Sequence, residues 1–163
     1  LGSDQAPGNN CSNMFNEMKF TSILNKCKAK DPTVFPAWKV LRMATIESAR
    51  AIGLGDEIGS LEVGKKADIL IIDMEQPCLS PVILDPVRNV VPNLVYSAKG
   101  SEVQTVIVDG RVLIDDYKVL PVDEKTVVRE AQSAAQRVCA AAKPAFDKIP
   151  DTPLRTMMQE GLL

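Results

Sequence analysis

Histidine is absent from all 163 residues of the sequence, and this absence limits the metal chemistry open to the chain. A catalytic zinc site draws three or more ligands from the protein, mostly histidine, cysteine, aspartate or glutamate. The cysteines form no C-x-x-C pair, which argues against a zinc ribbon or a redox motif and favours buried free thiols at Cys11, Cys27, Cys78 and Cys139. We therefore expect this chain alone to hold no catalytic metal and to show no turnover.

Other features are also scarce. Aromatic residues make up only 4% of the chain, and no apolar run approaches the roughly 20 residues of a membrane-spanning helix. No secretory signal peptide opens the sequence. The lysine clusters at 26–30 and 65–66 lack the interleaved aromatic residues that stack on nucleic-acid bases. With 45% hydrophobic residues and a formal net charge of −2, we expect a cytoplasmic protein with no nucleic-acid and no membrane partner.

The most informative segment is residues 59–73, which read G-S-L-E-V-G-K-K-A-D-I-L-I-I-D. Gly59 and Gly64 supply backbone freedom on either side of a short turn. The apolar run that follows, Ala67 to Asp73, is bounded by acids. A strand without polar alternation is typically covered on both sides, so this segment predicts a strand that is buried on both faces.

Two further segments fit with this one. Residues 1–10 read L-G-S-D-Q-A-P-G-N-N, and residues 41–54 read L-R-M-A-T-I-E-S-A-R-A-I-G-L. Together the three segments resemble, in the same order, motifs from the C-terminal third of the amidohydrolase superfamily. The resemblance is to the branch that holds the cytosine, guanine and methylthioadenosine deaminases and chlorohydrolase-like enzymes.

The resemblance implies a fold. A complete (β/α)8 barrel needs about 250 residues, so we expect an α/β C-terminal fragment of a metal-dependent hydrolase. Residues 1–55 would form the loop after the eighth barrel strand and the outer helices. Residues 56–120 would form the C-terminal half of a small β-sandwich, whose missing strands come from the N-terminal residues of the full protein. Residues 121–163 would form a terminal helix and tail.

The resemblance also implies one site residue. Asp4 stands where the family has an aspartate that binds the metal and accepts a proton from the attacking water. The complete enzyme would hold a divalent metal, zinc or iron, and would hydrolyse a C–N bond, releasing ammonia from an amino-substituted purine, pyrimidine or triazine-like ring. Gln5 replaces the usual glycine, which leaves the substrate open. Asp4 could instead be an ordinary loop residue, because aspartate favours turns.

A second interpretation is that the chain is a catalytically inactive assembly or oligomerisation module. Half of a sandwich and helices that normally pack on a barrel would expose apolar surface when alone, and large apolar patches usually bind partners. For the parent protein we expect a small-molecule substrate and a homo-oligomeric state. For this chain we expect the missing N-terminal barrel portion as a partner.

The apolar spacing predicts helices in the first and last parts of the chain. Ser12 or Asn13 caps a helix that runs to about residue 28 and ends before Asp31-Pro32. Two more are expected from Pro36 to residue 44 and over 46–52, the latter capped by Thr45 and ended by Gly53. A last helix runs from Asp123 to about residue 143. The first helix is expected to bury one apolar face, formed by Phe20, Ile23, Leu24 and Cys27. Met14 and Met18, four residues apart, could line a substrate pocket, but we expect them to lie in the core.

The remaining segments predict strands and irregular chain. The sequence Asp109-Gly110 between two β-branched runs is typical of a two-residue hairpin turn, so residues 105–114 form a hairpin. Residues 94–98 are expected to be its partner strand. Prolines keep residues 76–93 irregular, and they also keep the tail after residue 143 irregular. The C-terminal methionines and leucines, at 157–158 and 162–163, are expected to clamp onto the body or a partner.

Overall fold

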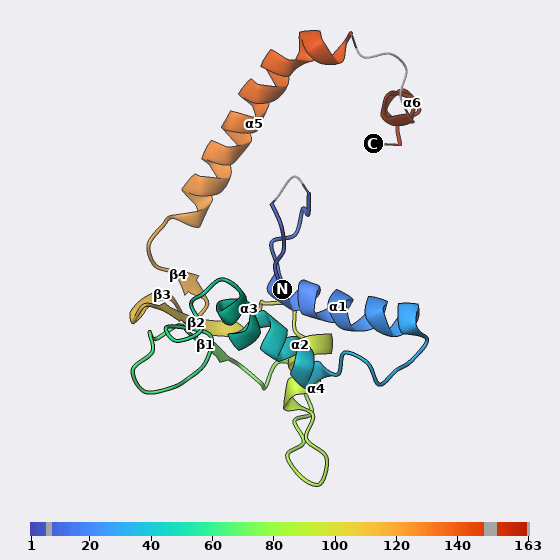
Figure 1. The fold of residues 1–163 in the computed structure, drawn as a ribbon. Coiled ribbons are helices and arrows are strands. Elements are labelled where there is room, and N and C mark those ends of the chain that lie inside the picture. Colours follow the sequence, from blue (N-terminus) through green and yellow to red (C-terminus); the bar gives the residue numbers. More distant parts are fainter. Residues whose placement is uncertain (6–7, 149–152, 163) are drawn as a thin grey trace. The chain divides into compact units, whose positions relative to one another are not determined.

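A computed structural model of the chain describes residues 1–5, 8–148 and 153–162 (Figure 1). The chain forms two compact units, Leu1–Leu120 and Pro121–Leu163. The first unit contains α1 (Met14–Ala29), α2 (Ala37–Ala44), α3 (Ile46–Ala51), β1 (Ile69–Ile72), α4 (Val90–Tyr96), β2 (Val103–Val108), β3 (Arg111–Asp115) and β4 (Lys118–Val119). The second unit contains α5 (Glu124–Phe146) and α6 (Pro153–Gln159). Within the described residues, no helix is long and apolar enough to cross a membrane.

The first helix begins and ends where the sequence predicts. The Asn13 side-chain oxygen accepts hydrogen bonds from the backbone nitrogens of Phe15 and Asn16, at 2.9 and 3.3 Å, and so caps α1. Lys30 follows the helix in the left-handed conformation, with φ 54°. The helix thus stops just before Asp31-Pro32, because the residue before a proline disfavours helical geometry.

The next two helices are confirmed, and Thr45 stands at the N-cap position of α3 as predicted, although its side chain makes no capping hydrogen bond. The Thr45 hydroxyl donates back to the Leu41 carbonyl at 2.8 Å, and no side-chain bond caps α3. Gly53 ends the helix as predicted, with φ 81°. The Leu54 nitrogen then donates to the Ala49 carbonyl at 2.8 Å, which completes a Schellman-type end.

The core of the first unit lies where α1, α2 and α4 meet. Its buried members are Met18, Ala37, Val40, Val91 and Val95. Met18 is therefore a core residue, as the sequence predicted, and Met14 is half-buried. The helices form one small apolar cluster that supports the segments on either side of it.

One buried polar contact joins these helices. The Ser22 hydroxyl lies 2.8 Å from both the Phe35 carbonyl and the Tyr96 hydroxyl. The Lys26 ammonium donates to the same Tyr96 oxygen at 2.9 Å. Burial alone would raise the pKa of Tyr96, but hydrogen bonds from Lys26 and Ser22 outweigh it and lower that pKa.

The predicted strand over residues 94–98 is wrong, since these residues belong to or follow helix α4. Val91 and Val95 are four residues apart, so a helix places both on one face, where they join the core. Pro92 lies in the first turn, where a proline costs no helical hydrogen bond. Tertiary packing thus overrides the strand preference of the β-branched residues. Residues 76–89 are irregular, as predicted, but residues 90–93 open the helix.

The sheet has four strands in the order β1-β2-β3-β4, and all described pairings are antiparallel. The predicted hairpin is confirmed, because β2 pairs with β3 around Asp109-Gly110. Both turn residues have positive φ, 48° and 76°, as a type I′ turn requires. β1 pairs with β2, with Ile69 opposite Ile107.

The fourth strand is β4, which the sequence did not predict. It pairs with β3 through a second tight turn at Asp116 and Tyr117, which have φ values of 46° and 62°. The Tyr117 hydroxyl donates to the Asp73 carboxylate at 2.8 Å, which raises the pKa of Tyr117. This bond joins the turn between β3 and β4 to Asp73, the residue that follows the edge strand β1.

Several residues predicted to be buried are exposed in this chain. Phe20 and Leu24 on α1 are 54% and 62% exposed, because α1 turns Met18 and Ser22 toward the core instead. Leu70 and Ile71 of β1 are about half exposed, so the strand is not covered on both faces. The cysteines are free, as predicted, but they are exposed, or half-buried in the case of Cys78.

The second unit is helical at both ends of its described part. Asp123 caps α5 by accepting from the Lys125 nitrogen at 3.2 Å. α5 continues through Pro144 to Phe146, and α6 begins at Pro153, so the prediction of an irregular tail is wrong for these residues. Proline suits the first turn of a helix, which accounts for the start of α6. Pro150 and Leu163 lie outside the described residues, whereas Met157, Met158 and Leu162 are exposed.

Candidate functional site

The loop that carries Asp4 has an unusual backbone. Asp4 is exposed and has a φ of 61°, in the left-handed region that residues with a Cβ rarely adopt. Its Oδ1 accepts from the Gln5 nitrogen at 2.7 Å. Its Oδ2 accepts no hydrogen bond from the described residues. A Cβ added to Gly8 would lie 3.3 Å from that Oδ2, so glycine keeps the space beside this oxygen open.

The N-terminal side of the loop is fixed to the helices. Leu1 packs against the core, and its carbonyl oxygen lies 3.2 Å from the Ser48 hydroxyl, which also lies 2.5 Å from the Met43 carbonyl oxygen. Met43 and Ser48 belong to residues 41–54, the second of the three segments that resemble family motifs. The segment from 41 to 54 therefore supports the backbone that leads to Asp4.

The C-terminal side of the loop is fixed to α1. The Asn9 side chain donates to Glu17 Oε1 at 2.6 Å and also accepts from the Cys11 nitrogen at 3.1 Å. Asn13 caps α1 and donates from Nδ2 to the Lys99 carbonyl at 2.5 Å. The two asparagines therefore hold the Asp4 loop against both α1 and the turn that precedes β2.

Among the described residues, Asp4 is not part of a group of side chains that could hold a metal ion. The described residues contain no group of three or more His, Cys, Asp or Glu side chains placed to hold a metal ion. The nearby Cys11 is exposed, and its sulfur accepts from the Asn16 side chain at 3.2 Å. A single carboxylate does not meet the ligand count of a catalytic zinc site. The residues present therefore fit one ligand of a metal site and no more.

A buried acidic residue was missed by the sequence analysis. Glu102 is 2% exposed, yet its carboxylate is ionised because four donors surround it. The Lys99 and Gly100 nitrogens donate to Oε2 at 3.0 and 2.9 Å, and the Cys78 thiol and Ser101 hydroxyl donate to Oε1 at 3.0 and 3.1 Å.

These hydrogen bonds decide the protonation of both partners. Burial alone would raise the pKa of Glu102, but the donors outweigh it and lower that pKa to about 2. The same bond to Glu102, together with burial, raises the pKa of Cys78. No spacing signal in the sequence marks Glu102, since two of its four donors are backbone nitrogens and a third is the thiol of the distant Cys78. The cluster fastens the loop after β1 to the start of β2 and has a structural role.

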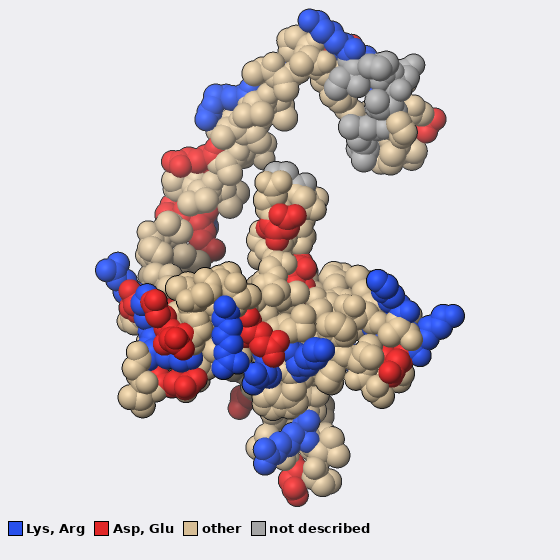
Figure 2. Space-filling model, viewed as in Figure 1, with Lys and Arg blue, Asp and Glu red and all other residues tan. Residues whose placement is uncertain are grey.

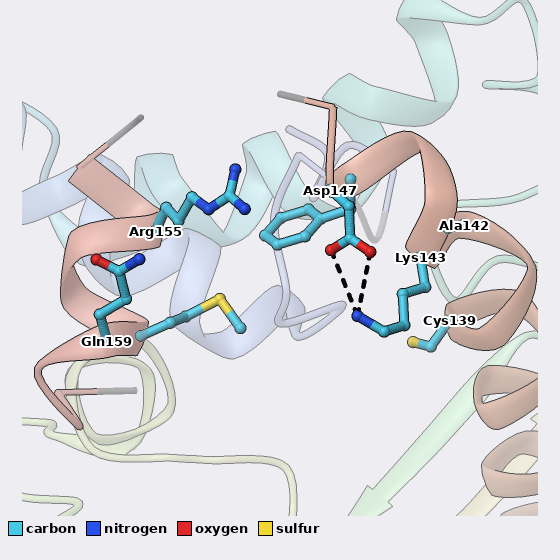
Figure 3. Close-up of a pocket in the computed structure, with 8 residues that line it drawn as sticks. Cys139, Ala142, Lys143, Asp147, Arg155 and Gln159 are labelled. Carbon is cyan, nitrogen blue, oxygen red and sulfur yellow. Dashed lines mark hydrogen bonds and ion pairs between the residues drawn. The ribbon is translucent and has the colours of Figure 1, made fainter. Parts of the chain in front are cut away.

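One pocket lies in the second unit and does not include Asp4. It has a volume of about 600 Å³ and is lined by Cys139, Ala142, Lys143, Phe146, Asp147, Arg155, Met158 and Gln159 (Figure 3). In this lining, Lys143 forms an ion pair with Asp147 at 3.2 Å. Because this pocket contains no residue of the Asp4 loop, it is not the candidate active site.

Charged side chains of both signs lie on the visible face of the first unit (Figure 2). On the face shown in Figure 2, lysine and arginine lie intermixed with aspartate and glutamate, and uncharged residues cover much of the rest. Lys66 pairs with Glu57 at 2.6 Å, and both side chains are half exposed. Such pairs contribute little to stability.

Comparison with known proteins places the chain in a family. The sequence profile described as the amidohydrolase family matches residues 1–113. A 5′-deoxyadenosine deaminase from Methanosarcina acetivorans is 46% identical over 142 residues, which is 87% of this chain and 31% of the relative. A 5-methylthioadenosine/S-adenosylhomocysteine deaminase from Desulforudis audaxviator is 47% identical over 138 residues, or 85% of this chain and 31% of the relative.

Solved structures agree with this placement. An adenosine deaminase from Xanthomonas campestris with bound zinc superposes with a TM-score of 0.76 at 33% identity, covering 83% of this chain and 30% of that one. The atrazine chlorohydrolase from Arthrobacter aurescens, in a complex with zinc and atraton, gives a TM-score of 0.68 at 21% identity, covering 79% of this chain and 28% of that one. The second likeness concerns the fold alone. The chain thus spans about a third of the length of the proteins it matches.

Proposed function

Because this chain belongs to the amidohydrolase family, we propose that it is the C-terminal portion of a metal-dependent hydrolase that deaminates an amino-substituted ring. The observation that carries the proposal is the identity of 46% to a protein named as a 5′-deoxyadenosine deaminase, over 87% of this chain. Several of the most similar relatives are named for adenosine-type substrates. A purine nucleoside altered at the 5′ position is therefore the favoured substrate class, ahead of a pyrimidine or a triazine.

The fold supports this role in outline. The α/β arrangement of the described residues superposes on zinc-bound enzymes of the family over most of its length. We propose that residues 1–55 complete the barrel and that the four-stranded sheet supplies part of a β-sandwich. The exposed faces of α1 and β1 would then be the surfaces that the rest of the protein covers.

Asp4 is the residue to which we assign chemistry. In the complete protein it would be one ligand of a divalent metal, zinc or iron, whose function when bound is to activate water. Asp4 would accept the proton of the attacking water and return it to the leaving amino group, so that water is consumed and ammonia is released. Its Oδ1 accepts from the Gln5 nitrogen, whereas its Oδ2 accepts no hydrogen bond from the described residues, and contacts of Leu1 with Ser48 and of Asn13 with Lys99 hold the two ends of the loop.

Reconstitution tests this proposal. The chain would be co-expressed with the N-terminal portion that completes a relative, loaded with zinc or iron, and assayed for ammonia release from 5′-deoxyadenosine. Asp4→Asn should lower kcat by a factor of at least about 100, the range for loss of a positioned proton acceptor. Asp56→Asn, the same change on an exposed loop aspartate, is the matched control. Activity that is indifferent to Asp4→Asn would remove Asp4 from the mechanism, and no ammonia from any amino-substituted ring would remove the deaminase assignment.

A second candidate function is that the chain serves as an assembly module. Exposed large apolar residues on α1 and α2, such as Leu24 and Trp38, favour this reading, because apolar surface of this kind usually binds a partner. Light scattering of the chain alone tests it. A monodisperse monomer at high concentration would contradict an assembly role, whereas the deaminase proposal would be unaffected. The cytoplasmic location stays a prediction.

A further inference from the structure

Within the second unit, helix α5 carries an apolar face along its length. Of its 23 residues, none is buried. Apolar residues recur along it at alternating spacings of four and three, at Val127, Ala131, Ala134, Val138, Ala141 and Ala145, which we call the α5 apolar face. Val127 and Val138 are 50% and 67% exposed. Spacing of this kind is typical of a helix that packs lengthwise against a second helix.

The two flanks of this face differ in charge. One flank carries Glu130 and Arg137, which are seven residues apart and therefore about 10 Å apart along the helix axis. The other flank is uncharged and consists of Val128, Ala135 and Ala142. This flank widens the apolar face without adding any group that needs a polar partner.

The charged flank indicates which kind of helix fits. When two identical helices pack antiparallel, the same flank of each helix faces the other. The charged flank of α5 would therefore lie beside the charged flank of α5 in a second copy. Setting Val127 opposite Val138 of the second copy also sets Ala131 opposite Ala134. In that register Glu130 lies beside Arg137 of the second copy, and the two-fold symmetry repeats the pair. A parallel arrangement would instead place the charged flank beside the uncharged one and form no ion pair.

We propose that α5 is a self-association surface, which binds α5 of a second copy of this chain in the antiparallel direction. Alanine at most positions of the face lets the two backbones approach closely, while the charges set direction and register. The pocket shared with α6 does not occupy this face, because of its lining residues on α5 only Ala142 belongs to a flank. The pairing is independent of the deaminase assignment, and its short overlap predicts a weak, reversible dimer.

Charge reversal tests the proposal in the full chain by sedimentation equilibrium over a range of concentrations. Glu130→Arg would face Arg137 of its copy, and Arg137→Glu would face Glu130, so each variant alone should dimerise about tenfold more weakly than the wild type. An equimolar mixture of the two variants forms both Glu–Arg pairs again. We expect the mixture to associate with nearly the wild-type Kd. A partner other than a second copy of α5 would not produce this recovery.

Arg129→Glu is the matched control. Arg129 lies on the opposite side of α5 from the apolar face, so the same charge reversal there should leave the Kd within about twofold of the wild-type value. Circular dichroism of each variant checks that α5 stays helical. The proposal is overturned if the wild type is monomeric at its highest soluble concentration, if neither flank variant weakens association, or if mixing the two variants restores nothing.

Discussion

Replacing the buried Glu102 by glutamine should destabilise the first unit in a strongly pH-dependent way. Its pKa is lowered from 4.5 to about 2, so folding favours the ionised form. A difference of this size corresponds to about 3 kcal/mol of stability at neutral pH. Glu102→Gln keeps the shape of the side chain but replaces one carboxylate oxygen with an NH2 group. At least one of the four groups that donate to Glu102 then loses its acceptor. We expect a loss of about 2–3 kcal/mol at pH 7.

The sign of the pH dependence follows from the lowered pKa. Stability from Glu102 is fully present above pH 4.5 and is lost as pH falls from 4.5 toward 2, where the carboxyl protonates in the folded state as well. Urea unfolding of wild type and variant, followed by circular dichroism from pH 7 to pH 3, measures the difference between them. That difference should shrink as pH falls. Glu75→Gln, on an exposed glutamate, is the control. A constant difference, or none at pH 7, would refute the role assigned to the ionised Glu102.

Two further predictions follow from the neighbouring groups. Glu102 and burial raise the pKa of the Cys78 thiol, so Cys78 should react with a thiol reagent at pH 8 more slowly than the exposed cysteines. Glu102→Gln should increase the reaction rate of Cys78. Equal rates for Cys78 and the exposed cysteines in the wild type would contradict this prediction. The two tyrosines should ionise in separate steps in an ultraviolet titration, Tyr96 below pH 10 and Tyr117 above it. Tyr96→Phe should remove the lower step and Tyr117→Phe the upper one, and a single step in the wild type would show that the hydrogen bonds to Asp73 and Lys26 do not control the two pKa values.

The elements that depend on local chemistry could be predicted from the sequence. Asn13 caps α1, Gly53 ends α3, and Asp109-Gly110 turns the β2–β3 hairpin, because each residue type suits the backbone at its own position. The family motifs likewise predicted membership in the amidohydrolase family, which the profile match over residues 1–113 confirms. Asp4 stays a predicted site residue, since its role depends on ligands from outside this chain.

The elements that depend on distant contacts could not be predicted. Residues 94–98 have strand-forming side chains, yet Val91 and Val95 join the core of α1 and α2 as a helix. The turn at Asp116 and Tyr117 lacks the glycine that marks such turns and is held by the bond from Tyr117 to Asp73, which lies 44 residues away. Glu102 is recognised only when the loop around Cys78 is folded against it.

The errors in predicted burial have a common physical cause. Apolar periodicity records which faces of a helix or strand lie against other atoms in the complete protein, whereas exposure in this structure records only contacts within the chain. Phe20 and Leu24 on α1 and Leu70 on β1 show the pattern of buried residues and yet are exposed. The chain spans about 31% of the length of its relatives, and the larger hydrolase that we propose would supply residues to cover these surfaces. The α5 face differs from them, because its flanking charges complement a copy of the same helix.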